Sequence, residues 1–115
     1  MKNDFMYQAE KLDAARRALM APHPKGETQS FVIAFQECDL AFYHLDVNAL
    51  EDDSARRWVS TIRRLMDTTG LQDPSGRGLW YVRVEQMSLE DKIEFARAVD
   101  ELASWFNKAF WQAHP

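Results

Sequence analysis

The fold is decided by residues 28–45, which read TQSFVIAFQECDLAFYHL. Apolar residues recur there every three or four positions, the spacing that places side chains on one face of an α-helix. The stripe consists of Phe31, Phe35, Cys38, Phe42 and Leu45. Ile33 and Leu40 lie opposite it, so we expect this helix, capped by Thr28, to be covered on both sides.

Helices are predicted on both sides of this stretch. Residues 4–20 repeat apolar side chains at helical spacing and are followed by Pro22 and Pro24, which end the helix. The acidic run at 51–54 supplies capping side chains for a third helix, which we expect to end at Gly70. Its apolar stripe comprises Ala55, Trp58, Val59, Ile62, Leu65 and Met66.

The last helix is predicted from Ser88 to about Trp111, because Ser88 and Asp91 are spaced like a capping box. Its apolar side covers about half of the circumference, which favours contact with two neighbouring elements. Before it, residues 71–78 have the Pro and Gly pattern of a loop. Residues 80–84 are rich in strand formers, and we expect them to be extended.

These elements predict an all-α fold, a compact four-helix bundle-like domain with a longer loop and a short extended segment before the last helix. The 115 residues suit a single domain, and 46% hydrophobic with 28% charged residues is typical of a globular protein. No apolar run is long enough to span a bilayer, and the first residues lack the apolar stretch expected of a secretory signal. Cys38 is the only cysteine, so no disulfide can form within the chain. We therefore expect a cytoplasmic protein that is not associated with a membrane.

Charge is segregated along the chain. Residues 1–53 carry a net charge of −5, residues 54–83 a net +4 and residues 84–115 a net −3. The six basic residues of the middle segment are all arginine, whose guanidinium group binds phosphate or carboxylate through two parallel hydrogen bonds. The anion-binding candidates are Arg56, Arg57, Arg63, Arg64 and Arg77.

A second interpretation of these arginines is a solvated face whose members pair with nearby acids, such as Arg63 with Asp67. The loop at 75–78 can likewise be interpreted as an anion-binding segment or as a structural turn. Its backbone N–H groups could receive a phosphate beside Arg77, or it is a plain turn.

Three polar residues fall on apolar helix faces and are candidates for buried polar groups. Arg16 lies within the stripe of the first helix and needs a carboxylate partner, for which we prefer Glu37 over Asp39, unless its stem reaches outward to solvent. Glu37 and His44 share a face, which suits acid–base chemistry or metal ligation, or else a structural histidine. The chain shows no complete set of catalytic or metal-binding residues, and no cofactor is predicted.

Arg17 and His23 are separated by five residues. This spacing resembles the Arg-x(4-6)-His motif of HEPN-type ribonucleases, which are small helical bundles and often dimers. The resemblance covers seven residues and implies Arg17 and His23 as a catalytic pair. In that family the motif usually lies near the later helices, whereas here it ends the first. A helix end followed by a loop histidine is the other interpretation, and the one we favour.

Aromatic residues crowd the end of the last helix and predict either an interface or packing against the N-terminal helix, two interpretations that we weigh about equally. The interface candidates are Ile93, Trp105 and Trp111. We therefore expect a non-enzymatic helical interaction or regulatory module, a homodimer whose arginine face contacts an acidic protein partner or a phosphate-bearing ligand. The alternative is an anion-, nucleotide- or nucleic-acid-binding protein that uses the same arginines, although a net charge of −4 weighs against general nucleic-acid binding.

Overall fold

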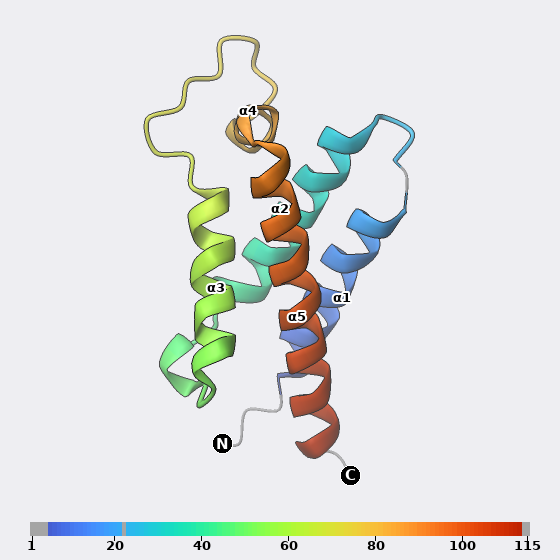
Figure 1. The fold of residues 1–115 in the computed structure, drawn as a ribbon, viewed down its shortest axis with the longest axis vertical. Helices are drawn as coiled ribbons and strands as arrows, with labels where there is room; N and C mark the ends of the chain where they lie inside the picture. The colour runs from blue at the N-terminus through green and yellow to red at the C-terminus, as the bar shows by residue number, and fades with distance from the viewer. Residues whose placement is uncertain (1–4, 22, 114–115) are drawn as a thin grey trace.

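The computed structural model describes residues 5–21 and 23–113, and these residues form helices and loops without a strand (Figure 1). The elements are α1 (Met6–Met20), α2 (Glu27–Tyr43), the 3₁₀-helix η1 (Val47–Ala49), α3 (Asp53–Met66), α4 (Leu79–Gln86) and α5 (Leu89–Ala113). The predicted all-α, bundle-like fold is confirmed. Four of the α-helices correspond to the predicted ones, and α4 is additional.

α5 has 25 residues and runs along most of the molecule (Figure 1). It packs against both α1 and α3, as its wide apolar stripe predicts. α2 packs against α1 and α4. The second apolar side of α2 is only partly covered, because Leu40 is 42% exposed.

The core joins α2 to α5 through aromatic rings. All five residues of the predicted α2 stripe are buried, and Phe35 and Cys38 are fully so. The Phe35 and Phe95 rings pack edge to face with their centroids 4.9 Å apart, and Phe31 lies 5.8 Å from the same Phe95 ring. Burying a phenylalanine side chain contributes about 1.5–3 kcal/mol, so these contacts account for much of the attachment between the two helices.

The prediction that residues 80–84 are extended is wrong, because they lie inside α4. Trp80, Val84 and Met87 are spaced so that a helix turns all three toward the core; Val84 and Met87 are buried and Trp80 packs against the core cluster. The strand propensity of this stretch is a weak preference, and no neighbouring strand exists in the described residues to pair with it. Burial on a helical face therefore decides the conformation.

Two predicted helix starts are confirmed by their caps. The Asp52 carboxylate accepts the Ser54 N–H at 2.7 Å at the start of α3. The Ser88 hydroxyl accepts the Asp91 N–H at 3.0 Å at the start of α5. Both contacts satisfy N–H groups that have no partner within the helix.

Two other boundaries differ from the prediction. α2 begins at Glu27, before Thr28, because Gly26 adopts a φ of 97° that favours glycine and brings the chain into the helix earlier. α3 ends at Met66 and not near Gly70, because Asp67 turns to an extended conformation. Gly70 does have a positive φ, but within the loop that follows.

Candidate functional site

The five arginines predicted to bind an anion do not all converge on one site. Arg56 and Arg57 line one open hollow near the start of α3, whereas Arg63 and Arg77 line two adjoining pockets beside α2 and α4. Arg64 pairs with Glu94 of α5. Anion binding by any one of them stays a prediction.

At the start of α3, the Arg56 side chain is bound by residues close to it in the sequence. Its guanidinium pairs with Asp53 and also donates to the Leu50 carbonyl oxygen. Arg57 is exposed and donates only to the Ser54 hydroxyl, at 3.3 Å. Of these two arginines, Arg57 therefore retains more donors for an external partner.

Two further arginines serve helix ends. Arg63 Nη2 donates to the Phe42 carbonyl oxygen at 3.5 Å, in the last turn of α2, and does not pair with Asp67 as the sequence suggested. Arg83 Nε donates to the Leu65 carbonyl oxygen at 2.7 Å, in the last turn of α3. Carbonyl groups in the last turn carry negative partial charge that a guanidinium stabilises, and the Phe42 carbonyl also accepts the Leu45 N–H at 3.2 Å.

The loop at 75–78 is organised by a carboxylate of the chain itself. Asp73 accepts the N–H of Arg77 at 3.0 Å and the N–H of Gly78 at 2.7 Å. These are the N–H groups that the sequence suggested for a phosphate, and Asp73 already binds them. The Arg77 side chain lies over the Tyr81 ring, 5.2 Å from its centre.

The predicted partner of Arg16 is wrong. Arg16 pairs with Asp13 at 2.8 Å and with Asp100 of α5 at 3.5 Å, and its side chain is 33% exposed. Because α1 packs against both α2 and α5, Arg16 reaches outward to α5 and not to the acids of α2. Glu37 instead lies 3.8 Å from Lys11.

His44 is not a buried polar group, contrary to the prediction. It follows the last residue of α2 and is exposed, with its ring 4.3 Å from that of Tyr43. The helical face that it was expected to share with Glu37 ends one residue earlier.

Among the interface candidates, Ile93 and Trp111 are 54% and 65% exposed. Trp105 is partly buried, because its ring packs 5.6 Å from that of Phe5 and its indole N–H donates to Asp52 at 3.1 Å. A role of these residues in an interface stays a prediction.

The Arg17 and His23 pair of the HEPN-like motif falls at the end of α1. Arg17 is exposed in the last helical turn, and His23 Nδ1 accepts the Lys25 N–H at 2.9 Å. Pro22, which lies within the motif, is outside the described residues. The histidine is thus engaged in a local turn, and its catalytic role stays a prediction.

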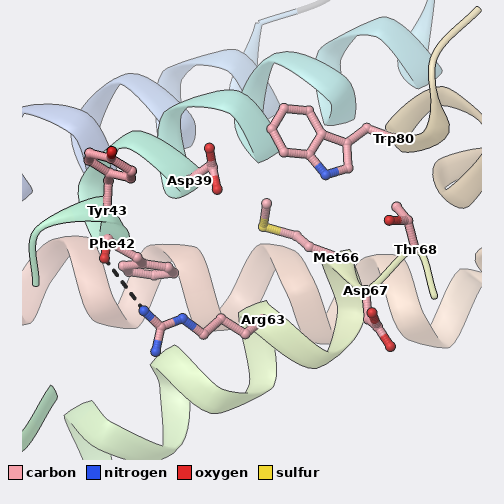
Figure 2. A pocket seen from close by; sticks show the side chains of 8 residues that line it. All are labelled: Asp39, Phe42, Tyr43, Arg63, Met66, Asp67, Thr68 and Trp80. Atoms are coloured by element: carbon pink, nitrogen blue, oxygen red, sulfur yellow. Dashed lines mark hydrogen bonds between the residues drawn. The ribbon is translucent and has the colours of Figure 1, made fainter.

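A groove lies between α2, the end of α3 and α4. It consists of two adjoining pockets of about 290 and 380 Å³ that share Thr68 and Trp80. The first is lined by Asp39, Phe42, Tyr43, Arg63, Met66, Asp67, Thr68 and Trp80 (Figure 2). The second is lined by Val32, Gln36, Thr68, Arg77, Gly78, Leu79, Trp80 and Tyr81.

The walls of this groove combine aromatic and charged groups. Figure 2 shows Asp39 between Tyr43 and Trp80 along one wall, with Met66 opposite. Tyr43 is 75% exposed, whereas Trp80 is held from behind by the buried Phe35, whose ring it meets edge-on at 6.4 Å. The groove therefore has one fixed aromatic wall and one accessible aromatic side chain.

The charged side chains that line the groove differ in the contacts that they form within the fold. Arg63 is bound to the Phe42 carbonyl and lies over the Phe42 ring, 5.4 Å from its centre. One Asp67 oxygen accepts both the N–H and the hydroxyl of Thr69, and these hydrogen bonds hold the pKa of Asp67 below its ordinary value. The Asp39 carboxylate has no hydrogen bond or ion pair with any other described residue.

Most of this groove was not identified from the sequence. Trp80 and Tyr81 were assigned to an extended segment, and Tyr43 and Met66 belonged to separate helices with no sign that they meet. Asp39 was considered only as a partner of Arg16. A helical assignment of α4 would have shown that Trp80 and Val84 share a face, and so that Trp80 lies beside α2.

No helix of residues 5–21 and 23–113 is both long and apolar enough to cross a membrane. Within the same residues, no cluster of three or more His, Cys, Asp and Glu side chains is placed to hold a metal ion. Comparison of the chain with protein-family models, with curated proteins and with solved structures gave no match.

Proposed function

We propose that this protein is a helical interaction module that binds a segment of a partner protein in the groove between α2, α3 and α4. The observation that supports the proposal is the groove itself, in which Trp80, Tyr43 and Arg63 line one continuous hollow. Tryptophan, tyrosine and arginine are the residues that contribute most to binding energy at protein interfaces.

The size of the groove favours side chains over a whole cofactor. Its two pockets, of about 290 and 380 Å³, are near the lower end of the roughly 300–1,000 Å³ that enclose small ligands. Their shared edge at Trp80 suits a segment that places one side chain on each side of the indole. Because Phe35 supports Trp80 from the core, little conformational freedom is lost there on binding.

The proposal is tested with a phage-displayed library of random linear peptides selected on the full chain. We expect selected peptides to shift the backbone amide NMR signals of α2, the end of α3 and α4. Replacing Tyr43 by alanine should weaken their binding about tenfold, the effect of losing one interface aromatic. Tyr43 is 75% exposed, so this change leaves the core intact.

Trp111→Ala is the matched control, because Trp111 is an exposed aromatic on another helix. Its replacement should leave peptide binding unchanged. Failure to enrich any peptide refutes the proposal. Loss of binding with Trp111→Ala alone also refutes it, and places binding at the end of α5, where the sequence predicts a dimer contact.

A further inference from the structure

We infer that the partner segment presents an arginine side chain, which enters the pocket between Asp39, Tyr43 and Trp80. This inference rests on the proposed function and specifies its ligand. It differs from the acidic partner expected from the sequence, because the arginines on which that expectation depends are largely engaged within the fold.

Two acids, Asp39 and Asp67, and two arginines line the groove, so its formal charges balance and the groups differ in how each is engaged. The cations among its lining residues are Arg63 and Arg77. Arg63 is engaged with the Phe42 carbonyl and ring, and Arg77 is engaged with the Tyr81 ring and donates to the Tyr81 hydroxyl at 3.3 Å. Both guanidinium groups already have neighbours that hold them in place.

Among the described residues, no group pairs with the carboxylate of Asp39. This side chain is exposed at the groove and forms no hydrogen bond or ion pair with another described residue. Asp67 has one oxygen engaged by Thr69, and its carboxylate points away from Asp39 and Trp80 in Figure 2. A cation entering the pocket therefore meets Asp39 as its counter-charge.

The aromatic walls favour arginine among the cations. A guanidinium is planar, stacks on indole and phenol rings, and binds a carboxylate through two parallel hydrogen bonds. Asp39 stands between Trp80 and Tyr43, so one guanidinium can meet the carboxylate and an aromatic face together (Figure 2). The fold itself places a guanidinium over an aromatic ring where Arg77 lies on Tyr81.

Binding through the Asp39 carboxylate should weaken as the salt concentration rises, because salt screens the attraction between exposed opposite charges.

The test uses the peptides selected on the full chain. We expect those that bind in the groove to share an arginine. Its replacement by citrulline, which keeps the shape and removes the charge, should weaken binding about fivefold, the size expected of one partly exposed ion pair. Asp39→Asn should weaken binding of the arginine peptide by a similar factor and leave binding of the citrulline peptide unchanged.

Glu101→Gln is the charge-matched control, because Glu101 is an exposed acid on α5 without a hydrogen bond or ion pair to another described residue. This change should alter binding less than Asp39→Asn. Two outcomes refute this inference and leave the proposed function standing: the selected peptides require Tyr43 but lack arginine, or they bind Asp39→Asn as tightly as the original chain. If no selected peptide requires Tyr43, the inference and the proposed function are refuted together.

Discussion

Replacing Arg83 by methionine tests whether the arginines of residues 54–83 serve helix ends. Arg83 Nε donates to the Leu65 carbonyl at 2.7 Å in a partly buried position. Methionine keeps an apolar stem but removes the donor, so a carbonyl in the last turn of α3 loses its partner. A hydrogen bond to a charged group contributes about 1.5–3 kcal/mol, and we expect the free energy of unfolding to fall by that amount.

Two matched variants set the scale. Arg63→Met removes a longer hydrogen bond, 3.5 Å, to a carbonyl that also accepts the Leu45 N–H, so the expected loss is about 0.3–1 kcal/mol, the range for a charge at a helix end. Arg57→Met removes only a contact with the Ser54 hydroxyl and should change stability by no more than about 0.5 kcal/mol. The predicted order of loss is Arg83, then Arg63, then Arg57.

The assay is urea unfolding followed by circular dichroism, with the midpoint and slope fitted for each variant. An unchanged slope shows that the same surface is exposed on unfolding, so the shift in midpoint reports stability. If Arg83→Met is no less stable than Arg57→Met, the hydrogen bond to Leu65 does not hold the end of α3, and the structural role given to these arginines is wrong.

Three further predictions follow from the core and from the loop after α3. Phe35→Ala should lower the free energy of unfolding by about 3–5 kcal/mol, because Phe35 is fully buried against Phe95; a loss below about 1 kcal/mol in urea unfolding contradicts this packing. Burial raises the pKa of the Cys38 thiol, so a thiol-reactive dye should label it only after denaturation, and rapid labelling of the native protein contradicts its burial. Hydrogen bonds from Thr69 lower the pKa of Asp67 from 3.8, so its charge stabilises the fold above that pH and the stabilisation is lost as the pH falls below it. The stability difference between the original chain and Asp67→Asn should therefore shrink below about pH 3.8, and a difference independent of pH refutes the effect.

The four predicted helices depended on signals that are local in the sequence. The α2 stripe from Phe31 to Leu45 repeats at helical spacing, and the caps at Asp52 and Ser88 act within three residues of themselves. α4 was missed because its 8 residues contain strand-forming side chains, and only burial of Val84 among other helices favours the helical conformation.

The candidate site depends on contacts between distant parts of the chain, which local signals do not reveal. Asp39 and Trp80 are 41 positions apart, and they line one pocket because α4 packs against α2. The partners of Arg16 and Arg83 likewise depend on which helices are neighbours. Residue type alone indicates that the guanidinium groups need hydrogen-bond acceptors. It does not indicate that backbone carbonyl groups are among these acceptors.

The segregation of positive charge into residues 54–83 has a structural explanation in these contacts. Three of its arginines donate to backbone carbonyls at the ends of different helical elements: Arg56 to Leu50 after η1, Arg63 to Phe42 in α2 and Arg83 to Leu65 in α3. Carbonyls at helix ends carry negative partial charge, and guanidinium groups offer several donors on a long side chain. Because Arg63 is turned toward the Phe42 carbonyl, it does not pair with Asp39, whose carboxylate has no hydrogen bond or ion pair with another described residue. The same contacts that favour a structural role for the arginines therefore favour a basic ligand for the groove.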